Sequence, residues 1–231
     1  MQRLTAVFAH PDDETFATGG TIARYASEGV HCSLYCATDG DAGRSSGIPV
    51  SSRADLGAVR REELHAACDV LGIRALVCGG HPDGGLHDVT PDVVIGEIVA
   101  LLRRERPDVV ITFGPEGAPT QHRDHRAISR LATAAFLLAG TTTAFPEQLG
   151  SGLEPHRPRE LWYSTWATPA PGDDPATEGQ PIDISVDVTD WLSVKRAAFE
   201  AHRTQHVHRA NFERLAMRDN EYYFVAIGAD K

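Results

Sequence analysis

LTAVFAHPDDE, residues 4–14, is the stretch that decides the predicted fold. Its first six residues are mostly apolar and suit a buried strand over 4–9, and the acidic cluster after them leads into a helix over about 14–27. Pro11 restricts the turn between the two. A buried strand that passes directly into a helix is typical of the βαβ units of a parallel sheet.

The first two-thirds of the chain repeat this alternation of short apolar runs and longer amphipathic runs. Further strands are expected at 30–37, 75–78 and 109–113, and further helices at 53–71, 91–104 and 123–139. They are followed by a strand at 160–166, a loop at 167–181, a strand at 182–188, a helix from about 190 to 206 and a strand at 222–227. The pattern predicts an α/β fold with a mostly parallel sheet flanked by helices. We expect a single domain over 1–231, with a core at about 4–140 and added C-terminal strands and a helix at about 160–228.

Charge and composition narrow the classes of partner. The chain has 231 residues and a formal net charge of −10, which repels nucleic-acid phosphates and anionic lipid, so neither is expected as the main partner. No apolar run in the sequence reaches the roughly 20 residues of a membrane span. The first residues lead straight into a strand without the apolar segment of a signal peptide, so we expect a cytoplasmic protein.

Side chains suited to chemistry follow the ends of four predicted strands. The acidic cluster at 12–14 follows the first strand, Asp39 and Asp41 the second, and Asp83 the third, while residues 122–125 lie beyond the fourth. Ligands of an open parallel sheet bind beyond the carboxyl ends of its strands. We therefore expect these groups to share one rim of the sheet. The first strand is not followed by G-x-G-x-x-G, which argues against a dinucleotide site.

Two short clusters carry side chains of the metal-ligand type. His10, Asp12 and Asp13 stand within four positions, and buried carboxylates need a positive partner such as a divalent cation, unless an aspartate only caps the helix. HRDH at 122–125 places two histidines three positions apart at the start of a helix. Both can face one metal ion, or both can be exposed without such a role. Together the clusters suit a catalytic zinc site with three protein ligands and a spare carboxylate that deprotonates water. The same donors also describe an Fe(II) site, and the sequence leaves that metal open.

The paired motifs AHPDDE at 9–14 and HRDH at 122–125 resemble the PIG-L/LmbE-like N-acetylglucosaminyl deacetylase family. The likeness extends to RREEL at 60–64, to PDGGL at 82–86, and to the late segment from Lys195 that ends in AHRTQ at 201–205. It runs from about residue 4 to residue 206. The resemblance implies a Rossmann-like, LmbE-like fold and allows trimers or hexamers.

Carried over residue by residue, the resemblance implies His10, Asp13 and His125 as the zinc ligands. It implies Asp12 as the general base that activates the water. Zinc is the metal that the family resemblance favours, with Fe²⁺ as the alternative.

The same resemblance implies roles for four further residues. His122 is expected to be the imidazolium that stabilises the developing oxyanion or protonates the leaving amine, with Asp124 orienting or charging it. Arg60 and Asp83 match positions that contact the sugar in the family. Their plain alternatives are a helix-surface ion pair for Arg60 and a turn position for Asp83.

One position departs from the family pattern. Some members place a tyrosine two residues before the first histidine of the second motif, as a further carbonyl polariser, and this chain has Thr120 there, which is too short for that role. Most histidines outside the motifs are expected to be structural or exposed, with His202 the best candidate to reach the rim. The polar loop at 38–52 suits either a lid or a surface excursion.

The function implied by the resemblance is hydrolysis of the N-acetyl group of a small molecule that carries N-acetylglucosamine. Candidate substrates are GlcNAc-malate, GlcNAc-inositol, a chito-oligosaccharide or a glycosylated natural product. The alternatives are an amidase of thiol S-conjugates in the same family, a metal-dependent oxygenase or phosphoesterase with the same ligands, and a zinc-containing sugar-binding protein without turnover.

Overall fold

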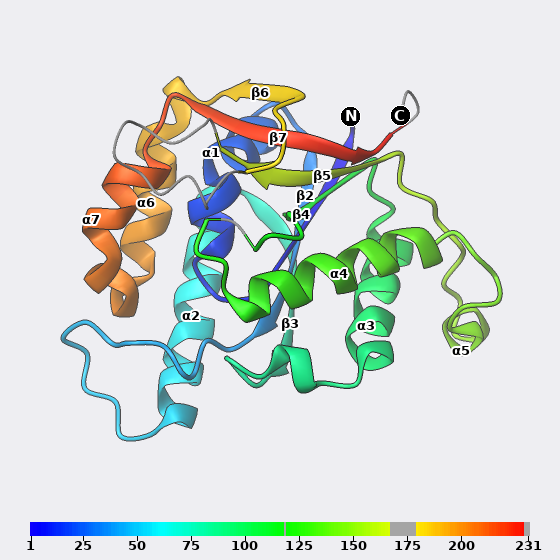
Figure 1. Ribbon diagram of the computed structural model, residues 1–231, viewed down its shortest axis with the longest axis horizontal. Helices are drawn as coiled ribbons and strands as arrows, with labels where there is room; N and C mark the ends of the chain where they lie inside the picture. Colours follow the sequence, from blue (N-terminus) through cyan, green and yellow to red (C-terminus); the bar gives the residue numbers. More distant parts are fainter. Residues whose placement is uncertain (118, 167–178, 229–231) are drawn as a thin grey trace.

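The computed structural model describes residues 1–117, 119–166 and 179–228. Seven strands form one sheet: β1 (Arg3–Phe8), β2 (His31–Thr38), β3 (Ile73–His81), β4 (Val109–Phe113), β5 (Glu160–Thr165), β6 (Ile184–Asp187) and β7 (Asn220–Ile227). Their order in the sheet is β3-β2-β1-β4-β5-β7-β6 (Figure 1). The neighbours from β3 to β5 pair in parallel, and β7 runs antiparallel to β5 and β6. The predicted mostly parallel α/β sheet is confirmed.

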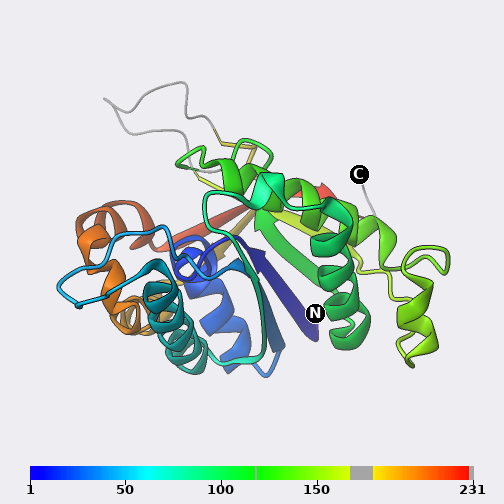
Figure 2. The ribbon, with the colours of Figure 1, turned by 90° about the horizontal axis from the view of Figure 1, so that it is seen from below.

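Helices cover both faces of this sheet. They are α1 (Asp13–Ser27), α2 (Arg53–Leu71), α3 (Pro91–Glu105), α4 (Arg123–Leu138), α5 (Pro146–Gly150), α6 (Leu192–Ala201) and α7 (Arg209–Asn211). Figures 1 and 2 show α1, α2 and α6 together on one side of the strands and α3 and α4 on the other. The central strands are therefore buried on both faces, which explains why their sequences read as continuous apolar runs.

Local signals in the sequence set several of the helix ends. The Ser52 hydroxyl accepts the Asp55 amide at 3.1 Å and begins α2, and Gly72 ends this helix at a φ of 78°. Pro91 is the first residue of α3, as the sequence predicts. His122 takes the N-cap position of α4, which fixes the start of the second motif.

The C-terminal part differs from its prediction. The single helix expected from about 190 to 206 is divided into a 3₁₀ turn (Thr189–Trp191), α6 and a second 3₁₀ turn (Arg203–His208), followed by α7 and a π turn (Phe212–Ala216). The break comes at His202, whose ψ of 62° leaves the helical region. The side chain of His202 is buried against α1, so a tertiary contact replaces continuation of the helix. Most of the loop expected at 167–181 lies outside the described residues.

Strand register brings the carboxyl ends of the strands to one edge. Phe8 of β1 pairs with Cys36 of β2, and Ala6 of β1 pairs with Ile111 of β4. The segments that follow these strands therefore meet at the rim where both motifs lie. Within the parts of the chain that the structure covers, no helix combines the length and apolarity that a membrane crossing requires.

Candidate metal centre and active site

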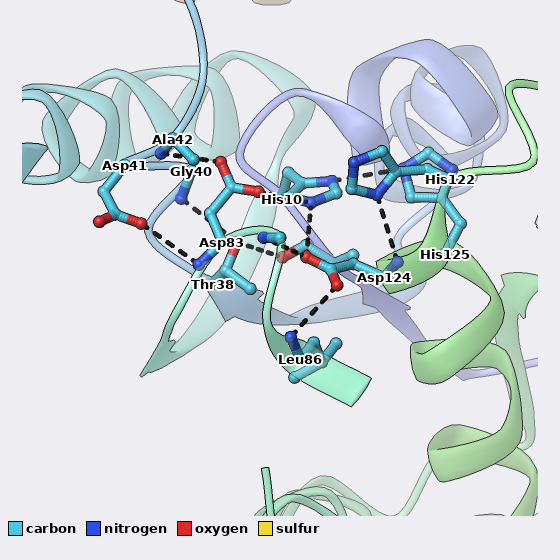
Figure 3. A network of polar contacts seen from close by, with 12 residues as sticks. His10, Thr38, Gly40, Asp41, Ala42, Asp83, Leu86, His122, Asp124 and His125 are labelled. Carbon is cyan, nitrogen blue, oxygen red and sulfur yellow. Dashed lines mark hydrogen bonds and ion pairs between the residues drawn. The ribbon is translucent and has the colours of Figure 1, made fainter. Parts of the chain in front are cut away.

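Three donor groups from two distant segments meet at the rim. His10 follows β1, Asp13 lies in the first turn of α1 and His125 in the first turn of α4. The His10 Nδ1 atom lies 3.2 Å from Asp13 Oδ2 and 3.3 Å from His125 Nε2, and His125 Nε2 lies 3.2 Å from Asp13 Oδ1. The rings of His10 and His125 are seen together in Figure 3. The imidazole of His125 stacks on Phe113 at the end of β4, with 4.1 Å between ring centroids.

The spacing of these atoms suits one divalent cation. Ligands about 2.0–2.1 Å from a tetrahedral zinc ion lie about 3.3 Å from one another. The distances between the donors of His10, Asp13 and His125 are 3.2–3.3 Å. All three residues are at most 8% exposed. The residues therefore fit a metal ion in both chemistry and spacing.

The far side of the His10 ring faces two further carboxylates. Its Nε2 atom lies 3.1 Å from Asp83 Oδ1 and 3.3 Å from Asp124 Oδ2 (Figure 3). Asp124 also accepts the backbone amides of Gly84 at 2.7 Å and Leu86 at 3.2 Å. A proton on Nε2 satisfies these carboxylates and leaves the Nδ1 lone pair directed at Asp13 and His125, which is how carboxylates orient metal-bound histidines.

The contacts of Asp124 differ from those that the family resemblance implies. Its carboxylate lies against His10 and the 84–86 loop, and it is the backbone amide of Asp124 that contacts His122, donating to Nδ1 at 3.2 Å. The expectation that the Asp124 carboxylate orients His122 is therefore corrected for this structure, whereas the charge of Asp124 acts in the expected direction and raises the pKa of His122 against the effect of burial. The reason is that His122 is the N-cap of α4, so its Nδ1 atom accepts the Asp124 amide, while the Asp124 carboxylate accepts the amides of Gly84 and Leu86.

The pKa values show how strongly the cluster attracts positive charge. Burial lowers the pKa of His10, but the charge of Asp13 and hydrogen bonds with Asp124, Asp13 and Asp83 raise it well above 6.5. Burial raises the pKa of Asp13, but His125 and His10 lower it well below 3.8. A divalent cation at the same place would supply the positive charge that a proton on His10 otherwise supplies.

Asp12 lies beside this cluster. It takes the N-cap position of α1, but its carboxylate makes no capping hydrogen bond, so the plain capping interpretation is wrong for Asp12. Its side chain keeps 15% of its surface exposed. Burial, opposed by Arg60 and reinforced by Asp13, raises the pKa of Asp12 to about 6. A carboxylate with such a pKa is suited to exchanging protons near neutral pH.

Arg60 is buried behind Asp12. It is 3% exposed, its Nη1 atom donates to the Gly40 carbonyl at 2.8 Å, and its Nη2 atom donates to the Pro11 carbonyl and lies 3.5 Å from Asp12 Oδ2. Gly40 leaves the space for this guanidinium, since a Cβ there would lie 2.3 Å from Nη1. The surface ion pair considered as the plain alternative is wrong, and a sugar contact by Arg60 stays a prediction.

Asp83 lies next to the same cluster, in the loop after β3. Its Oδ1 atom faces His10, and its Oδ2 atom accepts the backbone amide of Ala42 at 3.0 Å. The Asp83 amide in turn donates to Asp41 Oδ1 at 3.2 Å. These contacts attach the 38–52 loop to the rim, and sugar binding by Asp83 stays a prediction.

His122 is exposed at the edge of the cluster. Its ring centroid lies 4.9 Å from that of His10 and 5.3 Å from that of His125. Because Nδ1 accepts the Asp124 amide, the proton of the ring is on Nε2. Burial and the neighbouring His10 and His125 lower the pKa of His122. These observations favour a neutral ring over the imidazolium that the resemblance implies.

Thr120 and the 38–52 loop complete the surroundings. Thr120 Oγ1 lies 3.4 Å from His125 Nδ1, so the residue at the position of the family's tyrosine contacts a ring of the cluster. The loop contacts the C-terminal part, since the Ser46 amide donates to the Thr204 carbonyl at 2.8 Å and the Gln205 amide group to the Arg44 carbonyl at 3.0 Å. Opening and closing of this loop stays a prediction.

The sequence analysis assigns no separate role to Glu14, and it names His202 only as the best candidate among the other histidines to reach the rim. Both are fully buried, at 1% and 0% exposure, and Glu14 Oε1 lies 2.8 Å from His202 Nε2. Burial lowers the pKa of His202, but Glu14 raises it above its ordinary value. Glu14 belongs to the AHPDDE motif and His202 to the AHRTQ segment at 201–205, so both residues lie in segments that the sequence marks out. The contact between them could not be predicted from the sequence.

Residues 5–136 match the family described as PIG-L, GlcNAc-PI de-N-acetylase. The chain is 35% identical over 244 aligned positions to the 1D-myo-inositol 2-acetamido-2-deoxy-alpha-D-glucopyranoside deacetylase of Rhodococcus erythropolis, with 88% of this chain and 81% of the relative covered. It is 37% identical over 137 positions to the probable N-acetyl-alpha-D-glucosaminyl L-malate deacetylase 2 of Bacillus cereus, with 58% of this chain and 61% of that protein covered.

The fold is also shared with solved structures. The N,N'-diacetylchitobiose deacetylase from Pyrococcus horikoshii superimposes with a TM-score of 0.80 over 98% of this chain and 84% of that chain, at 23% identity. That likeness supports the fold, and the sequence matches support the kinship. The chain belongs to the PIG-L family of GlcNAc-PI de-N-acetylases.

Proposed function

We propose that this protein is a metal-dependent hydrolase that removes the N-acetyl group from an N-acetylglucosamine conjugate. The observation that carries the proposal is the group of three buried donors, 3.2–3.3 Å apart, with a separate carboxylate of raised pKa beside it. This combination is that of catalytic metal sites, in which three protein ligands leave a position open and a nearby base acts on water.

In this proposal His10 Nδ1, Asp13 and His125 Nε2 hold the metal, and zinc is the ion that the donor set suits best. A bound zinc ion acts as a Lewis acid that polarises the acetamido carbonyl and makes water acidic. Asp83 and Asp124 act behind the ligands, because they accept the Nε2 proton of His10 and so keep Nδ1 free to coordinate.

Asp12 is the proposed general base. Its carboxylate takes a proton from the attacking water and returns it to the nitrogen of the leaving amine when the amide bond breaks. The raised pKa supports both steps, because a carboxylate that titrates near 6 is ionised at neutral pH and still a useful acid once protonated. Arg60, at 3.5 Å, favours the ionised form.

His122 is the proposed donor to the oxyanion. Its Nε2–H is free of the N-cap contact that Nδ1 makes with the Asp124 amide, so it can donate to the carbonyl oxygen as negative charge develops there. A neutral ring donates this hydrogen bond and keeps its proton. His122 therefore stabilises the tetrahedral state, while Asp12 carries the protons.

We propose a GlcNAc-inositol conjugate as the substrate. The support is that the relative covered over most of both chains carries that activity in its name, at 35% identity. The malate conjugate is the alternative, since the relative with that name is 37% identical but covers 58% of the chain. A cytoplasmic location and assembly into trimers or hexamers stay predictions.

The test is release of free amine from both conjugates by the purified enzyme, with and without a chelator. We expect chelator-sensitive release, restored by zinc, and a larger kcat/KM for the inositol conjugate. Asp12→Asn is expected to keep its metal and lose turnover, because an amide cannot take the proton. Near-wild-type turnover of Asp12→Asn would refute the assigned base, and loss of metal would instead make Asp12 a ligand. Cleavage of a thiol S-conjugate without release of acetate would favour the amidase.

A further inference from the structure

A buried histidine from the C-terminal part of the chain reaches the back of the N-terminal motif. His202 follows α6, and its Nε2 atom lies 2.8 Å from Oε1 of Glu14 in the first turn of α1, with 0% and 1% of the two residues exposed. The proposed reaction uses neither group directly. His202 also lies outside residues 5–136, the part that the family model matches.

Glu14 connects this histidine to the backbone of the proposed base. Its Oε2 atom accepts the backbone amide of Asp12 at 3.0 Å, and its Oε1 atom also accepts the Thr15 hydroxyl at 2.6 Å. Both carboxylate oxygens are therefore occupied. Together the contacts make a continuous path from His202 through Glu14 to the Asp12 amide.

The backbone at Asp12 needs such support. Its φ of 119° and ψ of −26° lie outside the regions that side-chain-bearing residues ordinarily adopt. A strained position of this kind costs about 1–3 kcal/mol and persists only where surrounding contacts enforce it. The direction of the Asp12 carboxylate depends on this conformation, because φ and ψ determine where the side chain leaves the chain.

The peptide group between Pro11 and Asp12 is held at both of its polar atoms. Arg60 Nη2 donates to the Pro11 carbonyl, and Glu14 Oε2 accepts the Asp12 amide. Carbonyl and amide belong to the same planar unit, so two contacts on opposite sides fix its rotation. Arg60 comes from α2 and Glu14 from α1, and His202 gives the buried Glu14 carboxylate an ionisable hydrogen-bond donor.

We propose that His202 is a positioning residue for the catalytic base: by holding the Glu14 carboxylate, it keeps the Pro11–Asp12 peptide in the orientation that directs Asp12 at the substrate. This rests on the proposed function of Asp12. Without the histidine, the buried Glu14 carboxylate loses one of its three hydrogen-bond donors and keeps the Thr15 hydroxyl and the Asp12 amide. Rotation of the carboxylate toward another partner then releases the Asp12 amide. The metal donors do not depend on this contact, so metal binding is expected to persist.

Substitutions of His202 in the metal-loaded enzyme test the proposal. His202→Phe keeps a ring and removes the donor, whereas His202→Gln replaces the ring with an amide that reaches Glu14. We expect His202→Phe to lower kcat about 10- to 100-fold, as for a misplaced catalytic group, with KM and metal content unchanged. We expect His202→Gln to recover most of that loss. If His202→Phe does not fold, His202→Asn replaces it in the test. Its side chain is one carbon shorter than that of glutamine, so we expect the same loss of kcat as in His202→Phe.

Hydrogen exchange at the Asp12 amide gives a readout that is independent of activity. Loss of the Glu14 contact is expected to speed exchange of this amide in His202→Phe and not in His202→Gln. The matched control is Lys195→Met in α6, which removes another buried ion pair, with Glu221 at 2.5 Å, and leaves the Asp12 peptide untouched. It is expected to lower stability with kcat unchanged.

Two results would overturn the proposal. One is a kcat of His202→Phe close to that of the wild type. The other is an equal loss of kcat in Lys195→Met, which would show that any buried disruption near α6 has this effect. Failure of the proposed function is recognised separately, because it would appear as turnover retained by Asp12→Asn in an otherwise unchanged chain.

Discussion

Replacing the proposed base by its amide is expected to stabilise the metal-free protein while it abolishes turnover. Asp12 carries a carboxylate whose pKa is raised from 3.8 to about 6, chiefly because burial disfavours the charge. Above pH 6 the folded protein therefore holds an ionised group that is better solvated in the unfolded chain. Asp12→Asn removes that charge and keeps the size of the side chain, and asparagine tolerates a positive φ better than most residues.

The magnitude follows from the shift of the pKa. A difference of about 2 pKa units corresponds to about 3 kcal/mol at 1.36 kcal/mol per unit. Since the pKa is raised on folding, protonated Asp12 adds stability below pH 3.8, and this is lost as the pH rises through about 6. Asp12→Asn should therefore exceed the wild type by about 3 kcal/mol at pH 8 and by about half of that at pH 5. In a chain of this length the gain at pH 8 corresponds to about 6–12 °C in Tm.

Urea unfolding of chelator-treated wild type and variant at pH 8 and pH 5 measures this difference. The control is Asp108→Asn, because the amides of Gln2 and Arg3 donate to Asp108 and lower its pKa, so that substitution should destabilise at pH 8. Bound metal should reduce the gain of Asp12→Asn, since a nearby cation stabilises the carboxylate. Equal stability of Asp12→Asn and wild type at pH 8, or a gain that does not change with pH, would refute the reasoning.

Three further outcomes are expected. The kcat/KM of the metal-loaded enzyme should fall about tenfold per pH unit below a midpoint of about pH 5–6, where Asp12 becomes protonated. A pH–rate profile that stays flat down to pH 4 would contradict this. Asp124→Asn should weaken metal binding about 10- to 100-fold in a chelator competition, because it loses a carboxylate behind His10, and unchanged affinity would count against that role. The buried guanidinium of Arg103 donates to the carbonyls of residues 139, 141, 144 and 145. Arg103→Met should therefore lower the free energy of unfolding by about 3 kcal/mol and leave kcat unchanged. An altered kcat would connect this remote contact to the site.

The rim was predictable because apolar runs mark buried strands, and the residues directly after each run must lie at the strand end. Strand β4 was placed at its observed bounds, Val109–Phe113, from its apolar residues alone. The two motifs then had to meet, since parallel strands align their carboxyl ends. Which nitrogen of His10 faces which carboxylate was not predictable, because it depends on ring rotation and on amides contributed by the 84–86 loop.

The partners of the buried polar residues could not be predicted from the sequence. The sequence suggests a sugar contact or a surface ion pair for Arg60, but Gly40 leaves space for this side chain to turn inward to the Pro11 carbonyl. His202 is expected from the sequence to be structural or at best close to the rim, within a continuous helix that the structure breaks at this residue. In both cases the partner is a backbone carbonyl or a distant carboxylate, which leaves no periodicity in the sequence.

The surroundings of Asp12, the proposed base, disfavour both its charge and its backbone conformation. An ionised, partly buried Asp12 and a strained peptide both oppose folding, and the metal donors alone would not hold either in place. Arg60 and Glu14 hold the peptide from two helices, and His202, directly after α6, contacts the buried Glu14 carboxylate. A strained or buried charged residue lowers the stability of the fold, and contacts around it must compensate for that loss. On this reasoning the C-terminal part is required for turnover even though it contributes no proposed ligand, and a chain that ended after α4 would lack the geometry of its base.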